Sequence, residues 1–131
     1  MTIIEKIVNK DIPASIVFES ENVIAFIDNN PIKKGHLLIC PKKPYENIYD
    51  LPIQILNEIM KLSQVLTKKM IDNLNLTGVS LMQNNAGLNT LNHFHLHLIP
   101  REHDDALKFD DIRIGNLTIE EQDIINSKIN Y

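Results

Sequence analysis

The residues best suited to chemistry are three histidines that alternate with hydrophobic residues, His93, His95 and His97. Successive side chains of a β-strand point to opposite faces, so this spacing predicts three imidazoles on one face of a strand over residues 93–99. Alternate side chains are about 6.6 Å apart along a strand, a span comparable to a phosphate with its attacking and leaving groups. A neutral imidazole can attack phosphorus or carry a proton near pH 7. The pattern therefore favours phosphoryl chemistry.

The same histidines could instead bind a metal ion. Neutral imidazole is a common ligand of zinc and other transition metals, and His36 could supply a further nitrogen. Spacing alone therefore leaves two hypotheses open with equal support, catalysis at phosphorus and metal binding.

Composition restricts the partners of the chain. Its 131 residues fit one domain, and 44% hydrophobic with 23% charged residues is typical of a globular protein. A net charge of −4 is a poor basis for binding a nucleic-acid polymer, so any nucleotide should be bound singly in a pocket. The single cysteine, Cys40, argues against a disulfide framework, and no apolar run is long enough to cross a membrane. We expect a cytoplasmic protein without a membrane partner.

Hydrophobic patterning predicts the elements that must position the histidines. A short helix is expected over residues 2–9, and a long one over about 51–73. Strands are expected over residues 15–19, 23–28, 36–40, 78–83 and 93–99. Thr118 and Glu121 form the sequence pattern of a capping box, which predicts a short C-terminal helix. The order predicts an α+β fold: an antiparallel five-stranded sheet, one long helix packed on it, and short terminal helices.

The segment from His93 to Ile99 matches the signature of the histidine-triad (HIT) family, His-φ-His-φ-His-φ-φ, where φ is hydrophobic. Further blocks that resemble the family are residues 10–14, 25–31, 34–43 and 83–87, with Pro100-Arg101 after the triad. The nearest branch resembles the small nucleotide-binding phosphoramidases and their bacterial relatives. The resemblance implies a single HIT domain over residues 1–131, with a core over about 2–103 and a C-terminal tail over 104–131.

The resemblance also implies a mechanism. In the family the middle triad histidine, here His95, attacks the α-phosphorus of a nucleotide to give a nucleotidyl-histidine that water then opens. His93 and His97 bracket it, and His36 matches the histidine that supports the first triad member. Thr90 matches a hydroxyl donor that precedes the triad.

The implied nucleotide-binding residues come from several elements. Asp28 matches the carboxylate that accepts both ribose hydroxyls, and Asn84 matches the loop asparagine near the phosphate; Asn89 stands where the family usually has glutamine. The apolar slot for the base is matched by Phe26, Ile3, Ile4 and Ile7. Each has a structural alternative: Asp28 could form a turn, Asn84 could shape its loop, and the apolar residues could be plain core.

The implied substrate is a purine nucleotide with an amine, or alternatively a second phosphate, on its α-phosphorus. Many bacterial relatives bind a structural zinc through a Cys-x-x-Cys motif and a histidine, where this chain has Thr2, Glu5 and Pro44. We therefore expect neither metal nor cofactor, and the family implies a homodimer. The rival hypotheses are a dinucleoside polyphosphate hydrolase, a metal-binding module, and a nucleotide-binding regulator without turnover.

Overall fold

The computed structural model describes residues 1–131, which form a five-stranded sheet and three α-helices. The helices are α1 (Ile3–Val8), α2 (Ile53–Leu74) and α3 (Ile119–Ile129). The strands are β1 (Ile16–Glu19), β2 (Val23–Ile27), β3 (Leu37–Pro41), β4 (Gly78–Met82) and β5 (Leu96–Arg101). None of the helices combines the length and apolar character needed to span a membrane.

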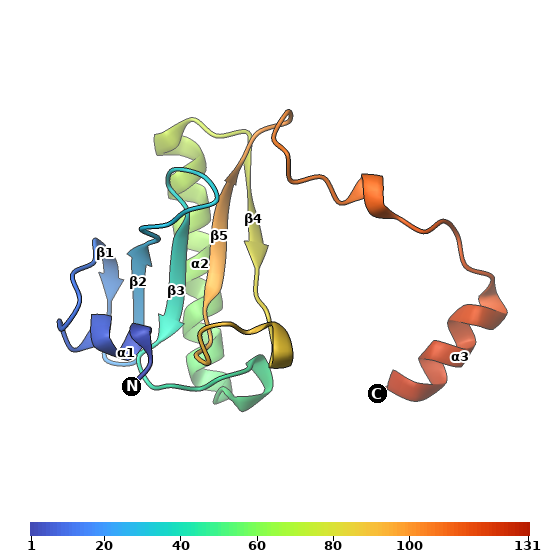
Figure 1. The fold of residues 1–131 in the computed structure, drawn as a ribbon, viewed down its shortest axis with the longest axis horizontal. Coiled ribbons are helices and arrows are strands. Elements are labelled where there is room, and N and C mark those ends of the chain that lie inside the picture. Colours follow the sequence, from blue (N-terminus) through green and yellow to red (C-terminus); the bar gives the residue numbers. More distant parts are fainter.

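All neighbouring strands are antiparallel, in the order β1-β2-β3-β5-β4 (Figure 1). The first three strands form a meander, and β5 then inserts between β3 and β4, so that Leu98 pairs with Leu37 on one side and with Leu81 on the other. The predicted α+β fold, with an antiparallel five-stranded sheet and one long helix, is confirmed. Strands β1 and β4 are the edges of the sheet.

The two faces of the sheet carry different helices. The long helix α2 packs on one face, where Ile59, Leu66 and Met70 join a buried core with residues of β2, β3 and β5. On the other face, Ile4 and Ile7 of α1 pack against the remaining side chains of β2 and β3. Because α1 is only 6 residues long, it leaves part of this face open. That open part is where a ligand can reach the sheet.

Strand β5 starts later than the alternating pattern predicts. Its ladder with β3 begins where Leu96 pairs with Ile39, so His93 and His95 precede the strand and only His97 lies within it. The segment that precedes β5 is irregular: Asn92 has a left-handed backbone (φ 53°), and the Phe94 N–H donates to a loop carbonyl rather than to a strand. The predicted strand over residues 93–99 was therefore wrong at its start.

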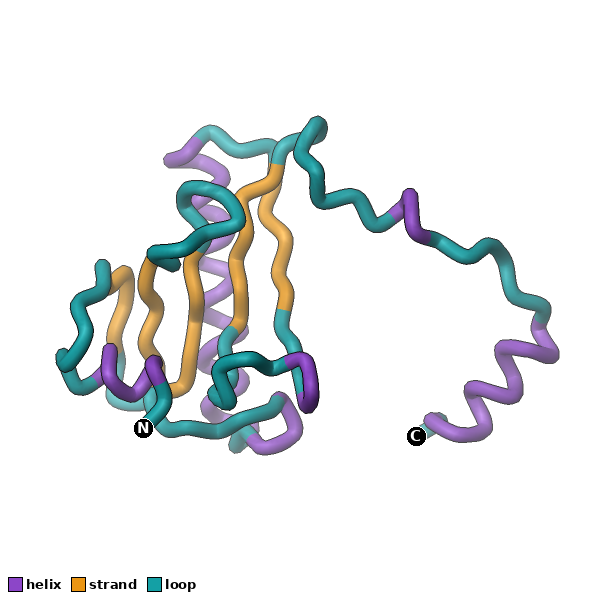
Figure 2. Tube along the Cα trace, in the orientation of Figure 1, coloured by secondary structure: helices purple, strands orange, loops and turns teal.

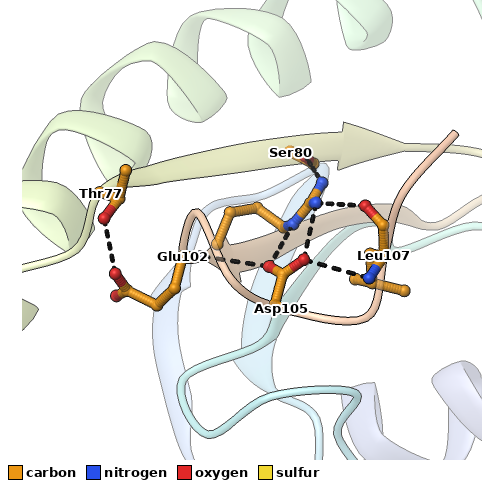
Figure 3. A network of polar contacts seen from close by, with 6 residues as sticks. Thr77, Ser80, Glu102, Asp105 and Leu107 are labelled. Atoms are coloured by element: carbon orange, nitrogen blue, oxygen red, sulfur yellow. Dashed lines mark hydrogen bonds and ion pairs between the residues drawn. The ribbon is translucent and has the colours of Figure 1, made fainter. Parts of the chain in front are cut away.

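The chain after β5 leaves the sheet as an extended arm that ends in α3 (Figures 1 and 2). A polar network anchors the start of this arm (Figure 3). The Arg101 guanidinium donates to both carboxylate oxygens of Asp105 at 2.6 and 2.9 Å and to the Ser80 hydroxyl at 2.8 Å. The Asp105 carboxylate also accepts the backbone N–H groups of Glu102 and Leu107. Residues 101–107 are thus tied to the edge of the sheet.

Candidate active site

A cavity of about 470 Å³ opens between α1, the ends of β2 and β3, and the segment that leads into β5. Its volume falls in the range of small-molecule sites. The apolar part of its wall consists of Ile3, Ile4, Ile7, Ile12, Pro13, Ala14, Phe26, Ile27, Leu38 and Leu91. The polar part consists of Ser15, Asp28, Asn29, Asn30, Thr90, His95 and His97. An apolar slot therefore leads to a polar end that holds two imidazoles.

His95 has a defined tautomer at the polar end of the cavity. Its Nδ1 lies 2.8 Å from the backbone carbonyl oxygen of His93. A carbonyl only accepts, so Nδ1 carries the proton and the lone pair of neutral His95 is on Nε2. Nε2 has no hydrogen-bond partner in the chain, and the side chain is otherwise buried. This imidazole presents an available nucleophilic nitrogen at the cavity.

His97 and His36 form a hydrogen-bonded pair behind that nitrogen. The Ile32 N–H donates to His36 Nδ1 at 3.1 Å, so the proton of His36 is on Nε2, which donates to His97 Nδ1 at 2.8 Å. The proton of neutral His97 is therefore on Nε2, and its ring lies against His95 with centroids 4.8 Å apart. Burial, followed by repulsion from charge on His95 and His36, lowers the pKa of His97 to about 4. Both rings of the pair are neutral at pH 7, because burial also lowers the pKa of His36.

His93 lies outside the cavity and is fully buried. Its Nε2 donates to the Pro41 carbonyl at 2.7 Å, and its Nδ1 accepts from the Thr2 hydroxyl at 2.7 Å. Burial lowers the pKa of His93, so the ring is held neutral and satisfied at both nitrogens. The three triad histidines thus have three different environments.

The position of Asp28 is compatible with both hypotheses for this residue, a turn former and a ligand-binding carboxylate. It follows β2, where its Oδ1 accepts the Asn30 N–H at 2.9 Å and forms the turn. Its side chain also lines the cavity, with Oδ2 3.7 Å from His36 Nδ1. A turn-forming carboxylate is therefore available to a ligand at the same time.

Several predicted residues lie elsewhere than expected. His36 contacts His97, the third triad histidine, and not His93, the first. Asn89 is buried: its amide N–H donates to the Glu46 carbonyl, and its amide oxygen accepts the Leu91 N–H. Its side chain therefore shapes the loop and does not line the cavity. The side chain of Asn84 is also outside the cavity wall. The remaining predicted residues, Ile3, Ile4, Ile7, Phe26, Asp28, Thr90, His95 and His97, all line the cavity.

The sequence did not indicate the contact of Thr2 with His93, because the two residues are 91 positions apart. A local signal was present: Thr2 and Glu5 form a capping box at the start of α1, with the Thr2 hydroxyl accepting the Glu5 N–H and the Glu5 carboxylate accepting the Thr2 N–H. The box predicts a helix start but not a partner for the free hydroxyl proton.

The four histidines are poorly arranged for one metal ion. Both nitrogens of His93 and of His36 are engaged in hydrogen bonds, as are Nδ1 of His95 and Nδ1 of His97. Asp28, His36 and His97 do offer ligand atoms within 4.8 Å of one another, but His36 has no free nitrogen to offer. The geometry therefore favours the first hypothesis, chemistry at phosphorus.

Known proteins are similar to this chain over most of its length. A HIT-like protein of Methanocaldococcus jannaschii is 38% identical over 117 residues, which cover 86% of this chain and 90% of that one. The adenosine 5′-monophosphoramidase of Saccharomyces cerevisiae is 33% identical over 98 residues, 73% of this chain and 60% of that one. A zinc-bound histidine-triad protein of Mycobacterium smegmatis has a crystal structure that superposes with a TM-score of 0.75 at 28% identity, over 82% of this chain and 80% of the other.

The zinc ligands implied by the family do not fit the residues present here. At those positions the Thr2 hydroxyl is bound to His93, the Glu5 carboxylate is bound to the Thr2 N–H, and Pro44 has no ligand atom in its side chain. The only thiol, that of Cys40, is buried beneath α1, and burial raises its pKa. A structural zinc site needs thiolate or imidazole ligands with a free lone pair, whereas the one imidazole at this corner, that of His93, has both nitrogens in hydrogen bonds.

Family membership follows from the sequence match together with the fold. The HIT domain model matches residues 9–104, which contain the whole sheet and α2. The histidine pattern, the five-stranded antiparallel sheet and the cavity all lie within or against that range. The chain belongs to the HIT family.

Proposed function

We propose that the protein is a nucleotide hydrolase or nucleotidyl transferase that cleaves a phosphoramidate P–N bond at the α-phosphorus of a purine nucleotide. The observation that carries the proposal is the His95 imidazole, which donates from Nδ1 to the His93 carbonyl and thereby exposes the Nε2 lone pair at the cavity. The relation to a yeast adenosine 5′-monophosphoramidase supports an amine as leaving group.

In the first step, the Nε2 lone pair of His95 attacks the α-phosphorus and the P–N bond to the amine breaks. The imidazole gains positive charge, which the His93 carbonyl stabilises through the Nδ1–H. The Nε2–H of neutral His97 donates a hydrogen bond to a phosphate oxygen, and the departing amine takes its proton from solvent water. In the second step, water attacks phosphorus, the P–N bond to His95 breaks with its electron pair returning to Nε2, and the proton of the attacking water passes to solvent.

The remaining cavity residues bind the nucleoside. The carboxylate of Asp28 accepts hydrogen bonds from both ribose hydroxyls, because its Oδ2 has no N–H partner in the chain. The base occupies the apolar slot, whose wall includes Ile3, Ile7 and Phe26. The Thr90 hydroxyl lies on the polar part of the wall and contacts the leaving group.

The test is a substrate panel of adenosine and guanosine phosphoramidates and dinucleoside polyphosphates. We expect turnover of the phosphoramidates, and His95→Ala should abolish it while purine nucleoside monophosphate still binds. Mass mapping after a rapid, acid-free quench should find the nucleotide on the peptide that contains His95. Turnover restricted to dinucleoside polyphosphates would identify the alternative hydrolase, and an adduct on another residue would contradict the mechanism.

A homodimer is the assembly that best suits the exposed surface. Strand β4 pairs only with β5, so its outer edge has free hydrogen-bonding groups. Beside that edge, Met60 and Leu81 are exposed. Light scattering of the purified protein should give twice the chain mass, and Leu81→Lys should lower it.

A further inference from the structure

The corner where relatives are expected to bind zinc contains a closed set of hydrogen bonds. The Thr2 hydroxyl accepts the Glu5 N–H at 3.1 Å and donates to His93 Nδ1 at 2.7 Å. The other ring nitrogen of His93 donates to the Pro41 carbonyl at 2.7 Å. This set, here called the Thr2–His93 clasp, ties α1 and the end of β3 to the segment before β5.

The clasp acts on an irregular segment of the chain. The β-ladder begins only at Leu96, and Asn92 has a left-handed backbone. The orientation of the peptide group between His93 and Phe94 is therefore fixed by few interactions. Its N–H donates to the Tyr45 carbonyl at 2.6 Å, and the clasp fixes the His93 ring to which the group is attached.

The same peptide group orients the nucleophile. Its carbonyl oxygen is the acceptor for His95 Nδ1 at 2.8 Å, and peptide planarity makes its direction depend on the groups that hold the plane. If that carbonyl turns away, neutral His95 is free to place its proton on Nε2, which removes the attacking lone pair.

We infer that Thr2 is a positioning residue: its hydroxyl fixes His93 so that the His93 carbonyl keeps His95 in the tautomer that attacks phosphorus. The side chain of Thr2 is not part of the cavity wall, so the inference concerns rate and not nucleotide affinity. The kinetic part rests on the proposed function.

The kinetic test compares Thr2→Val, which keeps the shape but loses the hydroxyl, with Thr2→Ser, which keeps the hydroxyl. Thr2→Val should lower kcat about fivefold to tenfold, the range expected for one hydrogen bond, and leave the Kd of adenosine monophosphate within about twofold. Thr2→Ser should restore kcat. A weaker affinity with unchanged kcat, or no difference between Thr2→Val and wild type, would overturn the inference.

Two control variants separate positioning from helix stability. Glu5→Ala removes the other half of the same capping box but leaves the bond between Thr2 and His93. Thr118→Val removes the corresponding cap of α3, which lies on the arm away from the cavity. Both should keep the wild-type kcat. If Glu5→Ala lowers kcat as much as Thr2→Val does, stability of α1 explains the effect and the positioning role is wrong.

A structural readout makes the test independent of turnover. Nitrogen-15 NMR of the imidazoles reports which ring nitrogen carries the proton, and His95→Ala identifies the signals of His95. Wild-type His95 should be in the Nδ1–H form, and Thr2→Val should show a mixture with the Nε2–H form. If wild type turns over no member of the panel, the proposed function fails while this shift still tests the clasp. An unchanged His95 tautomer in Thr2→Val would refute the inference whatever the activity.

Discussion

Acidification should destabilise the protein through the half-buried imidazole of His97. Burial and neighbouring imidazole charge depress the pKa of His97 from 6.5 in the unfolded chain to about 4 in the folded one. The unfolded state therefore binds the proton first as the pH falls, and stability is lost between pH 6.5 and about 4. A depression from 6.5 to about 4 corresponds to a loss of about 3 kcal/mol in the free energy of unfolding.

The assay is urea denaturation of wild type and His97→Asn at pH 7.5 and at pH 4. His36 and His93, whose pKa values are also lowered, contribute with the same sign in both proteins. Only the difference between the two pH dependences isolates His97. Wild type should lose about 3 kcal/mol more than His97→Asn over this interval. Equal losses in the two proteins would refute the conclusion that His97 is held neutral by the fold.

Three further predictions concern the ribose site, the core and the arm. Asp28→Ala should cost ribonucleotides about 1.5–3 kcal/mol of binding and narrow their preference over 2′-deoxy analogues, as competition titrations would show; an unchanged preference would leave Asp28 only its turn. Phe94→Ala should lower the free energy of unfolding by about 3–5 kcal/mol in urea, because the ring is 1% exposed within the core beneath α2; a loss below about 1 kcal/mol would contradict that packing. Arg101 holds the pKa of the Asp105 carboxyl well below its usual range, so the stabilising pair is intact above pH 3.8 and is lost on strong acidification. Asp105→Asn should mimic that loss at neutral pH by speeding protease cleavage of residues 102–108, and unchanged cleavage would show that the network does not restrain the arm.

Local sequence patterns predicted most elements, because their causes are local. The spacing of Ile59, Leu66 and Met70 predicts the buried face of α2, and these side chains do pack on the sheet. The pattern of Thr118 and Glu121 predicts the start of α3, where both bonds of the capping box form. Residue types and order alone thus determined the layer arrangement.

The start of β5 could not be predicted, because alternation of side chains does not specify where a ladder ends. His93 continues the alternating pattern, but its ring donates a hydrogen bond to the Pro41 carbonyl, and the backbone turns at Asn92. The hydrogen-bond partners of His36 and Thr2 were missed for a related reason. Each partner is a residue far away in the sequence, and only the assembled sheet brings the two members of each pair together. The loop hydrogen bonds of Asn89 could not be predicted either, because an amide side chain suits a ligand and a loop carbonyl equally well.

The central position of β5 has a consequence for how the protein folds. Strands β1, β2 and β3 can form by short-range pairing, but β4 joins the sheet only through β5, although β4 precedes it in the chain. The contact of His36 with His97 closes a loop across 61 positions. The conformational entropy of that loop must be lost before the pairing of β5 with β3 and β4 can stabilise the chain. The first three strands can therefore pair before the imidazoles meet. Substitutions in β5 should slow refolding, whereas substitutions in β4, which joins the sheet only through β5, should mainly accelerate unfolding.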